Sequence, residues 1–183
     1  MAHWVCLLRA VNLGARNKVP MPALREALSE AGFTEVRTYV QSGNIVLSSG
    51  HRSPRTVSDV VRGLVRERFD VDQPVVVRTA EQIQRLVESN PYPEAASQRP
   101  KLLHVHFLVA APAPTAVERV HADELTRDVV RIIGEDMYVD YVDAVHGTKL
   151  TPAYFERRLG VAGTARNWRT VLALAEMTAD AAG

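Results

Sequence analysis

The chain has 183 residues, of which 46% are apolar and 23% are charged, and its formal net charge at neutral pH is +1. This composition is that of an ordinary folded protein, and it excludes collagen-like repeats and intrinsic disorder. The small net charge excludes a protein that binds nucleic acid through a uniformly basic surface, although a local basic patch is compatible with it.

The single cysteine, Cys6, lies in the apolar run WVCLL, so no disulfide bond forms within the chain and we expect a buried, reduced thiol. The N-terminal residues lack the basic leader and continuous apolar stretch of a secretory signal, and no run of 18 apolar residues occurs. We therefore expect a cytoplasmic protein without a membrane segment, and we favour a monomer.

The first half of the chain is predicted to form a β-α-β-β-α-β unit from its apolar periodicity. The predicted elements are a strand at 4–14, a helix at 21–31, a hairpin with strands at 35–40 and 44–49, a helix that includes Val57 to Val65, and a strand at 74–79. This order is typical of a ferredoxin-like, or α/β-plait, unit with an antiparallel sheet and both helices on one face.

The second half nearly repeats this order. It is predicted to contain a helix at 80–89, a proline-rich loop at 90–100, a strand at 102–110, a helix at 114–122, a hairpin with strands at 128–133 and 137–142, and helices at 152–159 and 167–179. We therefore expect an α+β fold of two ferredoxin-like (α/β-plait) repeats, 1–79 and 80–183, packed as one compact unit.

A first cluster of polar residues follows the first predicted strand: Arg9, Asn12, Arg16, Asn17 and Lys18. A guanidinium in an apolar strand, as predicted for Arg9, must be paired or aimed at an anion, because removing its charge from water is costly. The loop can present cationic and amide donors to a phosphate or carboxylate. An arginine at the sheet edge or in an internal salt bridge is the alternative.

A second cluster, Gln41, Ser42 and Asn44, occupies the turn of the first hairpin. These side chains can hydrogen-bond a ligand, but turn chemistry alone also explains them. His104 and His106 are two residues apart in a strand and so share a face, a spacing compatible with one metal ion. No cysteine or acidic residue stands nearby in the sequence, and we expect no metal site.

The last cluster surrounds the two C-terminal helices. Thr151, before a proline, is a predicted N-cap, and Thr164 or Asn167 is expected to cap the final helix. Trp168 is either a core residue or the wall of a binding site.

Two cations of this cluster, Lys149 and Arg166, directly precede predicted helices. The helix dipole makes a cation unfavourable there unless an anion compensates it, so the pair indicates an anion site. Compensation by Asp143 or Glu156 within the chain is the alternative.

The motifs of common nucleophilic, zinc, redox and nucleotide-binding sites do not occur: GxSxG, HExxH, CxxC, GxGxxG after a strand, and the Walker spacing. This disfavours an enzyme that uses such a nucleophile or a nucleotide cofactor, and we expect no cofactor.

Several motifs, in order along nearly the whole chain, resemble one bacterial family, domain of unknown function 1697: LLRAVNLG, NKVPM, TYVQSGNIVLSS, NPY, LHVHFL, KLT, LG and TARNWRTVLAL. The resemblance implies an α+β protein of plait-like repeats and no established activity. The chain departs from the family pattern at three positions. Ala10 stands where the family usually has glycine, Ala15 where it often has glycine, and Thr148 where it usually has serine. The signature positions that the resemblance implies, without roles, are Arg9, Asn12, Lys18, Gln41, Ser42, Gly43, Asn44, Lys149, Thr151, Thr164, Arg166, Asn167 and Trp168.

The leading hypothesis is a binding protein that holds an anionic, phosphate-bearing ligand, or single-stranded nucleic acid, in one polar groove. The charge would come from Arg9, Lys18, Lys149 and Arg166, the orientation from Gln41, Asn44 and Asn167, and a stacking surface from Trp168. The alternatives are a metal-independent enzyme acting on a phosphorylated or carboxylated small molecule, and signature residues that only specify the fold.

Overall fold

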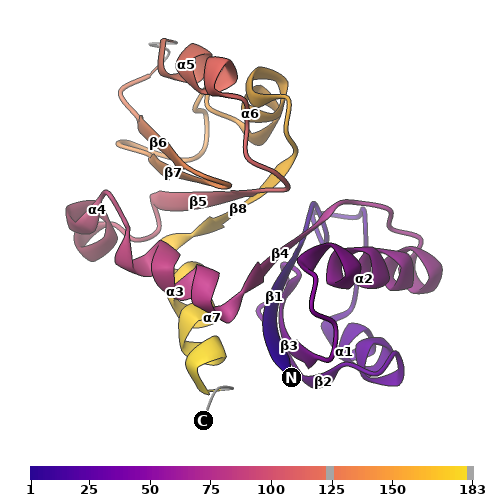
Figure 1. The fold of residues 1–183 in the computed structure, drawn as a ribbon. Coiled ribbons are helices and arrows are strands. Elements are labelled where there is room, and N and C mark those ends of the chain that lie inside the picture. Colours follow the sequence, from indigo (N-terminus) through magenta and orange to yellow (C-terminus); the bar gives the residue numbers. More distant parts are fainter. Residues whose placement is uncertain (123–125, 181–183) are drawn as a thin grey trace. The chain divides into compact units, whose positions relative to one another are not determined.

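The computed structural model describes residues 1–122 and 126–180. These residues form two compact units. The first unit consists of residues 1–87 and the C-terminal part of the chain from Leu172, and the second unit is Glu88–Val171 (Figure 1).

The first unit contains one antiparallel sheet of four strands. Its elements are β1 (Ala2–Leu8), α1 (Met21–Glu30), β2 (Thr34–Tyr39), β3 (Asn44–Ser49), α2 (Pro54–Phe69), β4 (Val75–Thr79) and α3 (Ala80–Glu88), the last extending to the unit boundary. The strand order is β2-β3-β1-β4. With α1 and α2 as the two crossovers, this order is the ferredoxin-like arrangement.

The core of the first unit lies between this sheet and the helices α1 and α2. Alternate β1 residues, Trp4, Cys6 and Leu8, are buried in the cluster that contains the apolar faces of both helices. Because side chains of a strand alternate between the faces, the residues between them face the other side of the sheet. Burial raises the pKa of the Cys6 thiol, so this cysteine is the buried apolar side chain that the sequence predicted.

The second unit repeats the arrangement. Its elements are α4 (Pro93–Gln98), β5 (Leu103–Leu108), α5 (Pro114–Ala122), β6 (Val129–Ile133), β7 (Asp136–Asp140), α6 (Pro152–Leu159) and β8 (Gly163–Asn167), followed by α7 (Trp168–Asp180), which continues into the first unit. The strand order β6-β7-β5-β8 corresponds strand for strand to that of the first sheet. Apolar residues of β5 and β7 pack against α5 and α6.

The predicted fold of two ferredoxin-like repeats with antiparallel sheets is therefore confirmed, and three local predictions are wrong. The first strand ends at Leu8 and not at residue 14, because Ala10 and Asn12 adopt positive φ angles. Residues 93–98, predicted as loop, form the short helix α4. Residues 163–167, predicted as the approach to a helix, form β8, which completes the second sheet.

No helix in the described ranges, 1–122 and 126–180, has both the length and the apolar character needed to cross a bilayer.

Gly43 is required where the first hairpin meets the end of β1. Its φ is +73°, and a Cβ there would lie 2.6 Å from Leu8 Cβ and 2.8 Å from Val11 Cγ2. We predict that Gly43→Ala lowers the free energy of unfolding by about 3 kcal/mol, from backbone strain and steric overlap together. Urea denaturation followed by Trp4 fluorescence in a Trp168→Phe background measures it.

Gly14→Ala is the matched control for this substitution. Gly14 has a similar φ of +61°, but an added Cβ would meet no atom within 4 Å. Its cost should therefore be about 1 kcal/mol, from the positive φ alone. Equal costs for the two substitutions would show that the contact with Leu8 does not matter.

Candidate functional site

The ten residues predicted to form a site divide between the units. The first unit contains Arg9, Asn12, Lys18, Gln41, Ser42 and Asn44, and the second contains Lys149, Arg166, Asn167 and Trp168.

In the first unit, Asn12 holds the loop that follows β1. Its Nδ2 donates to the carbonyl oxygens of Val19, at 2.9 Å, and Gln41, at 2.7 Å, and its Oδ1 accepts from the Val19 amide at 2.9 Å. Asn17 Nδ2 donates to the Ala10 carbonyl at 2.8 Å. Three of these bonds connect the two ends of the loop to each other, and the bond to Gln41 joins the loop to the hairpin turn, so the loop is a fixed structure and not a free connection.

The hairpin turn is held from within by Asn44. This side chain is fully buried, and its Nδ2 donates to the Tyr39 carbonyl and to Ser42 Oγ, both at 3.0 Å. Val40 adopts a φ of +50°, which is rare for a β-branched residue. The side chains of Asn12 and Asn44 therefore position backbone, whereas Gln41 is exposed.

The loop and the turn together form a surface that we call the cationic loop, residues 9–18 with residues 40–42. Arg16 and Lys18 are exposed on it and Arg9 is half-buried. These two segments contain three cations and no carboxylate. Two apolar side chains are also exposed there, Leu13 at 67% and Val40 at 54%. Arg9 lies just beyond β1, and not within the strand as predicted.

In the second unit, Lys149 is exposed three residues before the start of α6. Thr151 caps this helix as predicted, because its Oγ1 accepts from the Tyr154 amide at 3.1 Å. The neighbouring Thr148 hydroxyl donates to Asp128 Oδ2 at 2.9 Å, which ties the segment to the start of β6.

Arg166 lies within β8, and not in a loop before the helix. Its Nη1 donates to Thr164 Oγ1 at 2.7 Å and to the Ala165 carbonyl at 2.8 Å. Burial lowers the pKa of this guanidinium to about 10. Because the Thr164 hydroxyl lies in the strand and binds Arg166, Thr164 does not cap α7.

The first turn of α7 is capped by Asn167, whose Oδ1 accepts from the Thr170 amide at 3.0 Å. Trp168 is buried, with 4% of its surface exposed, and its amide donates to the Pro100 carbonyl at 3.1 Å. Within the second unit these two residues therefore fix the junction of strand and helix, which favours a structural role for both.

The two histidines of β5 lie beside Tyr141. The Tyr141 hydroxyl donates its one hydrogen to the Leu150 carbonyl at 3.3 Å, so His106 Nε2, at 3.2 Å from this hydroxyl, carries the hydrogen between them. Burial lowers the pKa of His106 to about 3 and also lowers that of His104. The described residues include no group of three His, Cys, Asp or Glu side chains that could hold a metal ion.

Sequence reasoning missed Arg78, which is the counterpart of Arg166. In the two sheets Arg78 pairs with Val5 and Arg166 pairs with Val105, and both arginines are buried. Each also donates from Nη1 to the carbonyl of the preceding residue. The signal was present in the sequence, since VRT before α3 and ARN before α7 each place arginine and a capping residue before a helix.

A second missed group is formed by His3, Ser48 and Glu35. Ser48 Oγ lies 2.8 Å from His3 Nδ1 and donates to a Glu35 carboxylate oxygen. Glu35 lies at an irregularity in the pairing of β2 with β3 and has a φ of +52°. Nothing in the sequence spacing joins these three residues, because the strand register alone brings them together.

The comparisons with known proteins concern family and fold. The model of the family described as protein of unknown function (DUF1697) matches residues 1–138. No curated protein matches the chain. A solved structure, that of the conserved bacterial protein SP0830 from Streptococcus pneumoniae, resembles it with a TM-score of 0.75, 21% sequence identity, and coverage of 97% of this chain and 98% of that chain. At this identity the likeness shows the fold alone.

Asn12 and Asn17 make a matched pair for testing the loop. We predict that Asn12→Asp lowers the free energy of unfolding by about 3 kcal/mol, because a carboxylate replaces a donor that faces two carbonyl oxygens. Asn17→Asp, which also has a positive φ but loses one such bond, should cost about 1.5 kcal/mol. Urea denaturation of both variants measures the difference, and a larger cost for Asn17→Asp would contradict the central role of Asn12.

The buried His106 should make the second unit sensitive to acid. Its folded pKa, about 3, lies below the unfolded value of about 6.5, so the unfolded chain binds the extra proton first. The contribution of neutral His106 to the free energy of unfolding is therefore complete above pH 6.5. It falls by up to about 1.4 kcal/mol per pH unit as the pH drops toward 3.

Denaturation followed by Trp168 fluorescence in a Trp4→Phe background, between pH 7.5 and 5, measures this slope. The His106→Gln variant should have a shallower slope, and the remainder should come from His104, whose pKa is lowered in the same direction. An unchanged slope would show that His106 is not the group responsible.

Proposed function

Because the chain belongs to the family described as protein of unknown function (DUF1697), as its motifs predicted, we propose a function from its own residues. The first unit binds an anionic ligand that carries phosphate or carboxylate groups, and it does so at the cationic loop. The family description names no ligand, so the proposal rests on geometry and charge.

The observation that carries this proposal is a cluster of cations on a fixed backbone. Asn12 and Asn17 hold the backbone beside Arg9, Lys18 and Gln41 through four hydrogen bonds. A surface that is already ordered loses little entropy on binding, so its cations attract an anion at low cost. The two segments themselves contain no carboxylate.

We assign the roles in this proposal by exposure. Arg16, Lys18 and the half-buried Arg9 supply charge, and the exposed Gln41 amide orients the ligand. Asn12, Ser42 and Asn44 act as positioning residues, because their side chains hold the loop and the turn.

In the second unit, taken by itself, Lys149 is exposed close to the N-terminus of α6 and is a separate point of contact for an anion. Arg166, Asn167 and Trp168 support that unit from the junction of β8 with α7. The proposed setting is the cytoplasm, where the buried thiol of Cys6 stays reduced.

No catalytic role is assigned in this proposal. The His3–Ser48–Glu35 group lies five residues before the end of β1, about 17 Å along the strand from the cationic loop. It is therefore too far away to transfer a proton to a ligand held by Lys18.

Calorimetric titration with inorganic pyrophosphate, and separately with a single-stranded ten-residue oligouridylate, tests the proposal. We expect Arg16→Ala and Lys18→Ala each to weaken binding about fivefold, because each removes one charged contact. Arg52→Ala, which removes an exposed arginine outside the cationic loop, is the control.

The two probes distinguish a small ligand from nucleic acid. Binding of the oligonucleotide should weaken steeply as salt concentration rises, since several phosphates would release counterions. If neither probe binds, or if Arg52→Ala weakens binding as much as Lys18→Ala, the cationic loop is not an anion site.

A further inference from the structure

We propose that the groove between α1 and α2 binds an aliphatic diamine or polyamine, with two ammonium groups about 12 Å apart. The groove belongs to the helical layer of the first unit and involves none of the residues assigned to the anionic ligand, so it stands independently of the proposed function.

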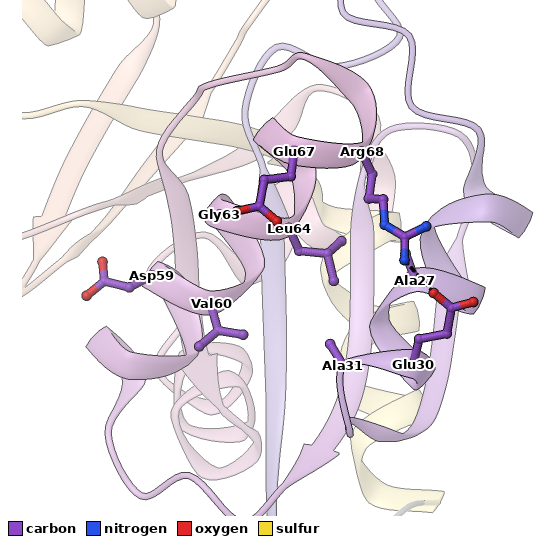
Figure 2. A pocket seen from close by; sticks show the side chains of 9 residues that line it. All are labelled: Ala27, Glu30, Ala31, Asp59, Val60, Gly63, Leu64, Glu67 and Arg68. Carbon is purple, nitrogen blue, oxygen red and sulfur yellow. Dashed lines mark hydrogen bonds and ion pairs between the residues drawn. The ribbon is translucent and has the colours of Figure 1, made fainter.

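The groove has a hydrocarbon floor and a charged rim. It encloses about 370 Å³. The floor is formed by small and apolar residues of both helices, Ala27, Val60 and Leu64, and by Ala31, which directly follows α1 (Figure 2). Such a floor favours the methylene groups of an alkyl chain, because contact removes apolar surface from water.

Three carboxylates line the groove, and they differ in their partners. Glu30 forms an ion pair with Arg68 at 2.5 Å, whereas no hydrogen bond or ion pair joins Glu67 to any residue that the structure describes. Asp59 lies 4.0 Å from Arg55, but both side chains are largely exposed, so this pair is weak. Asp59 and Glu67 are therefore available to a cationic ligand.

The spacing of these two carboxylates selects the length of the ligand. Both residues lie on α2 and are eight positions apart, which corresponds to about 12 Å along a helix. An extended chain of nine bonds between two nitrogen atoms spans about 11 Å from standard bond geometry. Spermidine and 1,8-diaminooctane have this spacing, and 1,4-diaminobutane, with five bonds, is too short.

Gly63 leaves the groove open between the two carboxylates. It lies in the interior of α2, where glycine is less favourable than alanine, yet an added Cβ would meet no atom within 4 Å. Packing within the chain therefore does not require a glycine there. The missing Cβ leaves room for a ligand to pass close to the helix backbone between Asp59 and Glu67.

NMR titration of the amides of α1 and α2 with 1,8-diaminooctane, spermidine and 1,4-diaminobutane tests the proposal. We expect the two nine-bond amines to bind at least about threefold more tightly than the five-bond amine, because only they reach both carboxylates. Asp59→Asn and Glu67→Gln should each weaken binding of 1,8-diaminooctane about threefold. Glu118→Gln, which removes an exposed carboxylate from α5, should leave it unchanged.

Gly63→Ala separates loss of the groove from loss of the fold. The methyl group should weaken binding of 1,8-diaminooctane at least as much as Glu67→Gln does, while the melting temperature of the variant is equal to or above that of the parent chain. Binding that is independent of amine length, insensitive to Gly63→Ala, or reduced equally by Glu118→Gln would overturn the proposal in favour of nonspecific charge attraction.

Discussion

The contact between Gly43 and Leu8 sets the position of everything at one end of the first sheet. The Leu8 amide donates to the Gly43 carbonyl at 2.9 Å, and the absence of a Cβ on Gly43 lets the turn lie against Leu8 and Val11. This contact brings the hairpin turn beside the point where β1 ends. Only then can the Asn12 side chain reach the Gln41 carbonyl and join the loop to the turn.

The two units share one arrangement of strands and helices, and comparing them explains the buried arginine that each unit has close to a helix cap. In each unit the second-to-last residue of an edge strand is a buried arginine, and the last residue of that strand caps a helix. Thr79 and Gln82 cap α3 by exchanging two hydrogen bonds, and Asn167 caps α7. These helices meet within the first unit, where Gln84 donates to the Ala175 carbonyl at 2.8 Å. Arg166 is therefore part of a repeated strand-to-helix junction.

The sequence predicted the fold where the period of the apolar residues was regular. The apolar residues of α1 and α2 recur at the spacing of a helix, which no strand fits. The glycine between β2 and β3 marks the turn of a hairpin. Prediction failed at β8, because five residues that contain a threonine and an arginine among the buried positions resemble a polar loop. It also failed at α4, which is short and begins with a proline, two features that are also typical of a turn.

For the candidate site, the sequence predicted which residues stand out but not which way they face. Asparagine in a loop serves a ligand or the backbone equally well, and only the hydrogen bonds of Asn12 and Asn44 show that both bind backbone. The His3–Ser48–Glu35 group depends on strand register, which the local pattern does not specify.

The burial of the Cys6 sulfur determines how fast the thiol is oxidised and makes it a probe of local opening of the first sheet. With 0% of its surface exposed and no second cysteine in the chain, the thiol can meet an oxidant or an alkylating reagent only when β1 separates from its neighbours. The rate at which Cys6 is labelled therefore reports how often the first sheet opens. A cysteine introduced on the surface would be labelled without interference from Cys6, which does not react while the sheet is closed.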